Sequence, residues 1–459
     1  MSRFAKTITV LILLSLAVPL AGLAFGLDSP NYSKEPLAPF PTFRLDSEYG
    51  PQFDRWWSDH FPFRSAIVTA YHKCLGALTG VSGSDQVVKG REGWYFFTPT
   101  IRDYVRSDYL DTRDAAKIAR SWEIQRRYVE ESGRSFIICV APNKSTVYPE
   151  FMPSWIRIVG EKRPIEYLKA MVSDECYLED VLLQEKETAP YHLYHREDTH
   201  WNLLGSYVAY REVLSRLFLS DRSLSFGEPR VEAEGWEGDL TNMLFPALRS
   251  SGEDIVFSGN EKEYTAKRPM RSPEDPVIET INGTKEGTVL MFRDSFANAW
   301  IDFFSNTFRT VHYSHVEPYR YDLLEEVDPD YVILEFAERN LDRMLLTTPE
   351  LDAPQAFEID GALRQVGAVG GEIEYEKRHH RHFYNFLPHD RQWAKELDAV
   401  QLFDGQSWYE AFPIYEQKDV SDNHRLYGFS LYTSKASDWS RIRYRTTEGW
   451  YEAVLDFVQ

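Results

Sequence analysis

Two short segments of the sequence contain residue types that can carry out acyl transfer. Residues 196–202 contain Asp198 and His200, with one residue between them, and residues 292–298 contain Ser295 directly after an aspartate. A serine hydroxyl is a poor nucleophile until a base removes its proton, and that base must itself be oriented by a third group. The spacing therefore predicts Ser295 as the nucleophile, His200 as the base and Asp198 as the group that orients the imidazole.

Each of these short patterns also has a simpler explanation. Asp198 could cap the helix that follows it, and an Asp-Ser pair arises often by chance. A metal site is a poorer interpretation of Asp198 and His200, because no other histidine supplies an i, i+4 partner or a His-x-x-Glu pattern. We therefore expect neither a metal nor an organic cofactor.

The elements predicted around these segments would bring the three side chains to one edge of a sheet. Apolar runs predict strands over residues 135–141, 288–292, 310–313 and 331–336, and helical periodicity predicts helices over 113–132, 164–172, 203–217 and 296–304. Strands that alternate with helices are typical of an α/β fold, in which helices cover both faces of a parallel sheet. Ser295 then lies at a strand-to-helix turn, where nucleophiles are well placed.

Other polar side chains near the predicted strand ends are candidates for substrate binding. They are Lys144, Arg293, Asn298, Glu335 and Arg339. Lys144 is equally consistent with a solvated loop, Asn298 with helix packing, and Glu335 with an ion pair to Arg339. The backbone N–H of Ser295 is the safest oxyanion donor.

The composition narrows the choice of partner. The formal charge of −20 and a pI near 5.1 leave no basic face for phosphate backbones, so nucleic acid is not expected as a partner. An uncharged or sparsely charged substrate fits better. The three cysteines are widely spaced and contain no Cys-x-x-Cys pair, so a thiolate zinc site is not indicated.

The pattern along the chain predicts four regions. Arg3 and Lys6 precede an apolar stretch, so residues 1–27 are predicted to be a signal anchor or a signal peptide that exports the rest of the chain. Residues 28–85 are predicted to form a tether and a helical cap, residues 86–353 a catalytic α/β domain, and residues 354–459 a small β-rich unit. Within the domain, residues 221–287 look irregular and are expected to line a substrate groove. The tryptophans and tyrosines after residue 354 could stack on sugars, although most are expected in a core.

Several motifs together resemble a known family. They are Asp-x-His at residues 198–200, Asp-Ser-Phe at 294–296, Asp-His-Phe-Pro-Phe-Arg at 59–64, Gly-Trp-Tyr-Phe at 93–96, Pro-Asn-Lys at 142–144 and Pro-Glu at 149–150. This set, over about residues 50–345, resembles the alginate O-acetyltransferases AlgJ and AlgX.

The resemblance implies a permuted SGNH-hydrolase-like domain, in which the Asp-His pair precedes the serine. It further implies transfer of an acetyl group to hydroxyls of an exported polysaccharide, in the periplasm or elsewhere outside the cytoplasm. Under this resemblance Ser295, His200 and Asp198 keep the roles given above, and a multispanning membrane acyltransferase supplies the acetyl group. One departure stands out: many members have glycine where this chain has Arg293, which leaves the second oxyanion donor open.

Two other functions remain open on the sequence alone. A polysaccharide O-acetyl esterase or deacetylase would use the same three residues with water as the acceptor. A non-catalytic polysaccharide-binding scaffold would use none of them as a nucleophile.

Overall fold

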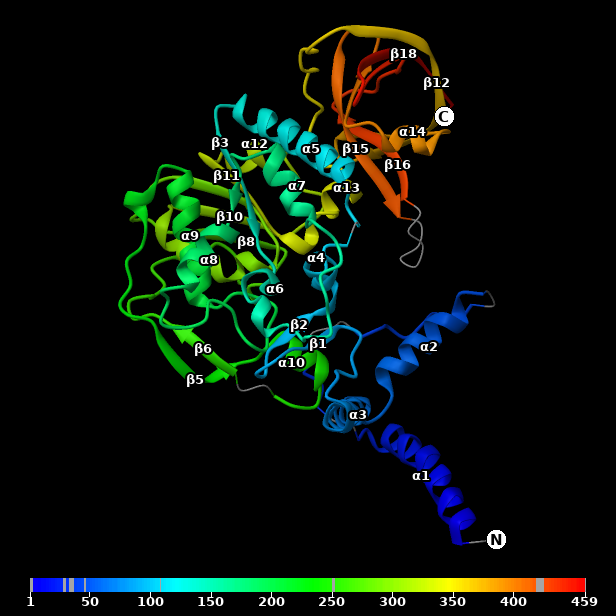
Figure 1. The fold of residues 1–459 in the computed structure, drawn as a ribbon, viewed down its shortest axis with the longest axis vertical. Coiled ribbons are helices and arrows are strands. Elements are labelled where there is room, and N and C mark those ends of the chain that lie inside the picture. Colours follow the sequence, from blue (N-terminus) through cyan, green and yellow to red (C-terminus); the bar gives the residue numbers. More distant parts are fainter. Residues whose placement is uncertain are drawn as a thin grey trace.

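The computed structural model describes residues 3–27, 30–32, 37–44, 47–107, 109–249, 252–417 and 425–458. The predicted tether and cap over residues 28–85 therefore lie partly outside the described residues. Within them the chain forms an α/β domain, a β-barrel that follows it, and three helices at the N-terminal end (Figure 1).

A seven-stranded sheet forms the centre of the α/β domain. Its order is β4 (Cys176–Tyr177), β3 (Ser135–Ala141), β11 (Tyr331–Ala337), β9 (Thr288–Phe292), β10 (Thr310–Ser314), β8 (Val277–Ile281) and β7 (Thr265–Ala266). The first five strands are parallel, whereas β8 pairs antiparallel with β10 and β7 antiparallel with β8. The predicted parallel sheet is thus confirmed for its core and acquires an antiparallel edge.

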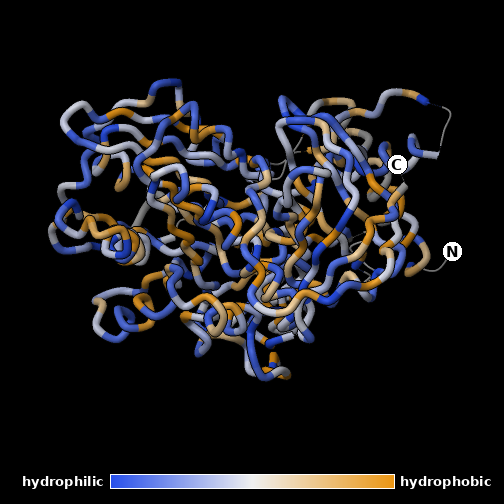
Figure 2. Tube along the Cα trace, turned by 90° about the horizontal axis from the view of Figure 1, so that it is seen from above, coloured by the Kyte–Doolittle hydropathy of each residue, from blue (hydrophilic) through white to orange (hydrophobic). Residues whose placement is uncertain are grey.

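The two faces of this sheet are buried in separate cores. Ile137 and Cys139 of β3 point into one core, while Phe136, Ile138 and Val140 point into the other. Side chains alternate across a strand, so a run of apolar residues is buried on both sides only when both faces are covered. The apolar strands of the sheet accordingly lie inside the molecule, and hydrophobic stretches of the trace run through its centre (Figure 2).

Helices cover both faces, as the sequence predicted. One core contains residues of α9 (Leu203–Arg216) and α11 (Ile301–Thr307), and the other contains residues of α5 (Thr112–Glu130) and α7 (Pro164–Met171). The smaller elements of the domain are β1 (Val87–Lys89), β2 (Tyr95–Phe97), η1 (Thr98–Thr100), α4 (Ile101–Tyr104), α6 (Lys144–Val147), η2 (Pro149–Phe151), α8 (Glu179–Lys186), η3 (Ser220–Arg222), α12 (Leu323–Val327), η5 (Glu338–Asn340) and α13 (Arg343–Leu346).

Two predicted features differ from the structure. The helix expected over residues 296–304 is a 3₁₀ turn, η4 (Ser295–Trp300), followed by α11. The segment 221–287 is more regular than expected: it contains the hairpin β5 (Arg230–Trp236) and β6 (Gly252–Val256), the helix α10 (Asp239–Leu244), and the edge strands β7 and β8. The segment is polar and contains glycines, so its pattern did not indicate strands. Its strands are half exposed or pair with partners distant in sequence.

The N-terminal helices are α1 (Arg3–Phe25), α2 (Tyr49–His60) and α3 (Arg64–Thr79). Helices α2 and α3 lie in the region that was predicted as a helical cap, and α3 contacts α10 of the α/β domain. Among the described residues of the chain, none of the helices combines the length and the apolar character that crossing a membrane would require.

The β-rich unit after residue 354 is a closed barrel in the order β12-β13-β16-β15-β14-β17-β18. Its elements are β12 (Leu363–Arg378), β13 (Arg381–Pro388), α14 (Arg391–Lys395), β14 (Ala399–Phe403), β15 (Trp408–Gln417), β16 (Arg425–Thr433), β17 (Arg441–Thr446) and β18 (Gly449–Val458). Closure leaves few unpaired strand edges, which suits a small exposed unit.

The barrel is joined to the α/β domain by a buried ion pair. Arg120 of α5 lies 2.6 Å from Glu410 of β15, and their side chains are 5% and 0% exposed. The other oxygen of Glu410 accepts hydrogen bonds from the Phe357 N–H and from Gln401. Removing one partner of such a pair leaves an uncompensated buried charge.

We therefore expect Arg120→Met to lower the free energy of unfolding by about 3–5 kcal/mol. Arg127→Met is the matched control, because both guanidinium groups lie over the Phe357 ring, at 4.1 and 4.3 Å, whereas Arg127 pairs only with the exposed Glu131. The control should cost about 1 kcal/mol or less. Equal losses for the two variants, measured by denaturant unfolding, would contradict a special contribution of the buried pair.

Candidate active site

Ser295 lies at the carboxyl edge of the sheet, three residues after β9 ends. Asp294 begins the turn that presents it, and its carboxylate accepts hydrogen bonds from the Phe296 N–H (2.8 Å), the Ala337 N–H (2.7 Å) and the Asn340 side chain (2.8 Å). These contacts join the turn after β9 to the segment after β11. Ser295 itself is half-buried, so its hydroxyl is held by a rigid turn and still reaches the surface of a cavity.

His200 and Asp198 meet this hydroxyl from the segment before α9. His200 Nε2 lies 2.8 Å from Ser295 Oγ, and His200 Nδ1 lies 2.6 Å from Asp198 Oδ1. The Trp201 indole N–H donates to the Phe296 carbonyl at 3.0 Å, which ties the two segments together beside the contact. The structure thus brings the three predicted residues into one continuous hydrogen-bonded chain.

A buried lysine, Lys144, holds the segment that carries Asp198. Lys144 Nζ donates to the carbonyls of His195 (3.1 Å), Arg196 (3.1 Å) and Asp198 (2.6 Å). Three acceptors match the three N–H bonds of an ammonium group. Burial lowers the pKa of Lys144 to about 7, although the Asp198 and Asp239 carboxylates act in the opposite direction. The predicted role of Lys144 in substrate binding stays a prediction, and the structure gives its amine backbone partners.

The carboxylates around His200 determine its protonation. Burial lowers the pKa of His200, but Asp198 raises it more, with a further contribution from Asp239, so the pKa ends above the ordinary 6.5. Burial would raise the pKa of Asp198, yet the His200 charge and hydrogen bond bring it well below the ordinary value. Asp198 is therefore ionised at neutral pH and favours the imidazole tautomer whose Nε2 faces Ser295.

Asp239 is a member of the site that sequence reasoning missed. Its backbone N–H donates to Asp198 Oδ2 at 2.9 Å, and its carboxylate accepts the Thr199 N–H and hydroxyl at 2.8 and 2.6 Å. It also lies 3.8 Å from His200 Nδ1. An acidic residue at the start of a short apolar helix was the only signal, and it occurs in the segment expected to be irregular.

The same three residues, Asp198, His200 and Asp239, place their ligand atoms within 4.8 Å of one another, as in a metal site. However, both Asp198 oxygens accept backbone N–H groups, and both imidazole nitrogens already face a carboxylate and a hydroxyl. Each of these atoms therefore already has a partner among the described residues.

Arg293 and Asn298, two of the predicted substrate contacts, bind each other. Arg293 Nη1 donates to Asn298 Oδ1 at 2.5 Å, and its Nη2 donates to the Pro273 and Asp275 carbonyls at 2.7 and 3.2 Å. Arg293 is only 1% exposed, whereas Asn298 lines the cavity and donates to Glu274. The arginine thus fastens the loop before β8 onto the turn that carries Ser295.

Glu335 and Arg339 do not pair with each other in the described structure. Glu335 is fully buried and accepts the Asp294 N–H at 3.2 Å, and burial beside Asp294 raises the pKa of its carboxyl well above the ordinary value. Arg339 lies 5.0 Å from the Phe296 ring and lines the cavity. No acceptor among the described residues pairs with the Ser295 N–H, which leaves it available to an oxyanion.

A cavity of about 900 Å³ opens over the three residues. Its described lining comes from residues 97 to 339, and much of it belongs to the segment 221–287, including Trp236, Asp254 and Pro273. The segment predicted to be irregular thus lines the cavity over Ser295, and its role in a substrate groove stays a prediction. The barrel supplies none of the described lining; its Trp450 is buried, and its Trp439 packs against the barrel core.

The raised pKa of His200 predicts how the reactivity of Ser295 depends on pH. Because only neutral imidazole can accept the Ser295 proton, labelling by a serine-directed fluorophosphonate should rise with pH through the His200 pKa, with its midpoint above 6.5. Asp239→Asn removes a carboxylate that raises this pKa, so the midpoint should move to lower pH.

The labelling rate should be measured from about pH 5 to about pH 9, on either side of the ordinary histidine value. Asp254→Asn is the control, because this carboxylate lines the same cavity but lies near His195, at 3.8 Å, and should shift the midpoint less. A midpoint that stays fixed or rises in Asp239→Asn would contradict the assigned coupling.

Comparison with known proteins gives one family. Residues 87–252 match the model of the SGNH hydrolase-like domain of the acetyltransferase AlgX, a range that includes Asp198 and His200 but ends before Ser295. None of the curated proteins matches the chain.

Several solved structures are similar to parts of the chain. Bacillus cereus PatB1 is 16% identical with a TM-score of 0.42, over 55% of this chain and 95% of that one. The O-acetyltransferase domain of Pseudomonas putida AlgJ is 16% identical with a TM-score of 0.35, over 56% and 91%. Pseudomonas aeruginosa AlgX is 10% identical with a TM-score of 0.34, over 81% and 96%. From the family model, the predicted resemblance to the alginate O-acetyltransferases is confirmed, and residues 87–252 are similar to their SGNH hydrolase-like domain.

Proposed function

We propose that this protein is an O-acetyltransferase that moves an acetyl group through Ser295 to hydroxyls of an exported polysaccharide. The observation that carries the proposal is the continuous contact from Asp198 through His200 to Ser295, at 2.6 and 2.8 Å, on the wall of a large cavity. The match of residues 87–252 to an acetyltransferase family adds support.

The proposed first step forms an acetyl-enzyme. His200 Nε2 takes the proton of the Ser295 hydroxyl as Oγ attacks the carbonyl carbon of an acetyl ester, and the Ser295 N–H donates to the oxyanion. The imidazolium, stabilised by Asp198, then gives its proton to the departing alkoxide. The products of this step are acetyl-Ser295 and the free alcohol of the donor.

The second step regenerates the enzyme. A sugar hydroxyl in the cavity gives its proton to His200 while its oxygen attacks the acetyl carbonyl, and the collapse of the intermediate returns that proton to Ser295 Oγ. A bound hydroxyl competes well with water because its effective concentration at the reacting carbon is high.

The proposal extends to the setting of the reaction. Residues 1–27 would act as signal anchor or signal peptide, so that residues 28–85, 86–353 and 354–459 work outside the cytoplasm as tether and cap, catalytic domain and β-rich unit. A multispanning membrane acyltransferase would deliver the acetyl group, because the sequence contains no acetyl-coenzyme A motif. The proposal also includes stacking of sugars on aromatic side chains of the barrel. One of them is Trp408, whose ring centroid lies 3.9 Å from Arg443 Cζ.

Replacing the nucleophile tests the first step directly. Ser295→Ala should lower acetyl release from a chromogenic acetyl ester by at least about 10⁴-fold. Its thermal unfolding should change little, since one half-exposed hydroxyl is lost, with a cost of about 1 kcal/mol or less. Ser173→Ala, at an exposed serine that bonds only its neighbour Asp174, is the control with unchanged turnover. Normal turnover in Ser295→Ala would refute the acyl-enzyme.

The fate of the acetyl group separates a transferase from an esterase. Adding oligosaccharides to the enzyme and the acetyl ester should speed donor consumption and divert acetyl from free acetate into sugar ester, followed by mass spectrometry. Longer oligomers should act better than single sugars, because they fill more of the cavity. Acetate release that ignores every oligomer, together with removal of acetyl from an acetylated polymer, would identify a deacetylase instead.

A further inference from the structure

We infer that the acceptor is a polymer of uncharged or amino sugars rather than a polyuronate, and that it extends from the site cavity into a second cavity across Trp236. This inference rests on the proposed function, since it names the substrate class of the same site.

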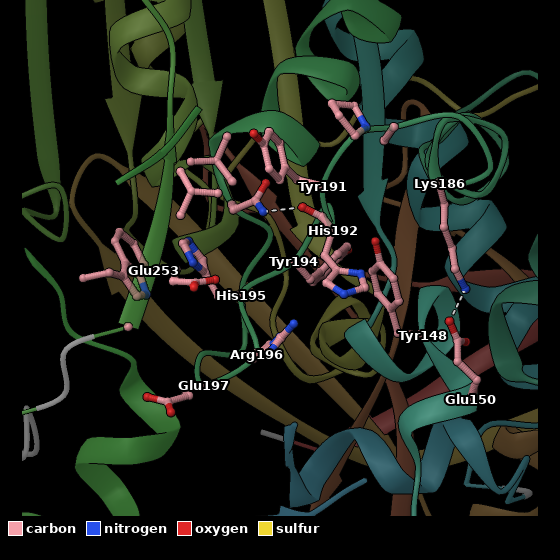
Figure 3. A pocket seen from close by; sticks show the side chains of 17 residues that line it. Tyr148, Glu150, Lys186, Tyr191, His192, Tyr194, His195, Arg196, Glu197 and Glu253 are labelled. Carbon is pink, nitrogen blue, oxygen red and sulfur yellow. Dashed lines mark hydrogen bonds and ion pairs between the residues drawn. The ribbon is translucent and has the colours of Figure 1, made fainter. Parts of the chain in front are cut away.

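The second cavity, of about 600 Å³, adjoins the first. Both are lined by His195, Asn202 and Trp236, so these residues form the wall between them. Figure 3 shows His195, Glu197 and Glu253 at one end of the second cavity and Lys186 with Glu150 at the other. A chain bound over Ser295 that continues past this wall enters the second cavity.

The dividing wall has the surface that sugar rings pack against. The Trp236 indole is stacked on the His195 imidazole, with ring centroids 4.0 Å apart and planes 7° from parallel. Burial lowers the pKa of His195 to about 4, so this pair is uncharged at neutral pH. Rigid aromatic surfaces pair with the apolar faces of a ligand, while nearby polar groups fix its orientation.

The charged side chains that line the site cavity are mainly acidic. Its carboxylates are Asp198, Asp239, Asp254 and Glu274, and Arg339 is the only lysine or arginine among its described lining residues. Lys144 lies behind the loop and gives its N–H groups to three backbone carbonyls. Carboxylates accept hydrogen bonds from sugar hydroxyls and attract ammonium groups, but they repel other carboxylates.

The charged side chains of the second cavity do not offset the acidic side chains of the first. Lys186 is neutralised by Glu150 at 2.8 Å, so that Arg196 is the remaining basic side chain of the described lining, which also includes Glu197 and Glu253. Glu253 is exposed on β6 and forms no ion pair within the described part of the chain. A polymer with one carboxylate per residue would meet repulsion in both cavities, in addition to the field of a chain with formal charge −20.

A matched pair of oligosaccharides tests the inference. Hexamers of β-1,4-mannose and β-1,4-mannuronate differ only in the oxidation of C6, and a glucosamine hexamer adds positive charge. Their binding should be measured by calorimetry with the full-length Ser295→Ala protein, which makes the readout independent of acetyl transfer.

We expect the mannose or the glucosamine hexamer to bind at least about tenfold more tightly than the mannuronate hexamer at about 0.1 M salt, with the gap narrowing at about 1 M salt. Glu253→Lys should narrow the gap by about three- to tenfold. Glu372→Lys makes the same change of charge on an exposed position of the barrel, and should leave the gap unchanged. The tighter hexamer should also exceed its own dimer in affinity, because only the longer chain spans both cavities.

The inference would be overturned if the mannuronate hexamer bound as tightly as the other hexamers or more tightly. It would also be overturned if none of the three hexamers bound. A gap that ignores both salt and Glu253→Lys would remove its electrostatic basis, and a dimer as good as the hexamer would remove the second cavity. These results are distinguishable from failure of the proposed function, which would appear as loss of Ser295-dependent acetyl release in the unaltered protein.

Discussion

The hydrogen bond between Ser295 and His200 is the contact on which the site depends, and it joins two segments 95 residues apart in sequence. Both segments are also held by contacts to other parts of the chain. The serine turn is fixed by Asp294, whose carboxylate accepts three N–H donors, and the histidine segment by Lys144, whose amine reaches three carbonyls. The Asp294 carboxylate and the Lys144 amine thus hold backbone groups on opposite sides of one contact.

The sheet makes this arrangement possible, because β3, β9 and β11 run parallel and end at the same edge. Lys144 follows β3, Asp294 follows β9, and Glu335 lies near the end of β11. Glu335 and Asp294 bring two carboxyl groups together, and the raised pKa of Glu335 removes one of the two charges. The Arg293 guanidinium beside them contributes positive potential while it fastens the neighbouring loop.

The sequence was most informative where the signal was local. Apolar runs predicted β3 and β9 with their observed bounds, because both faces of these strands are buried, and the Asp-x-His and Asp-Ser patterns identified the three residues that meet at the site. It was least informative where partners are remote. The barrel is closed by pairing β12 with β18, which lie at opposite ends of the unit, and no residue pattern specifies that pairing. The orientation of the Lys144 side chain could not be predicted either, because its hydrogen-bond partners are backbone carbonyls of a loop some fifty residues later in the chain.

Under the proposed function, the residues that carry out the chemistry and the residues that select the acceptor lie in different parts of the fold. Ser295 and His200 are positioned by buried strands, an aromatic contact to Phe296 and backbone ties, all of which tolerate little change. Trp236, Asp254 and Glu274 come instead from the segment 221–287, whose hairpin and loops lie over the sheet edge. Among the described residues, Arg293 and Asn298 link this segment to the serine turn, through the Pro273 carbonyl and the Glu274 carboxylate. Under the proposed function, the lining from this segment would bear on the choice of acceptor, whereas the contact from Asp198 through His200 to Ser295 would serve many acceptors equally.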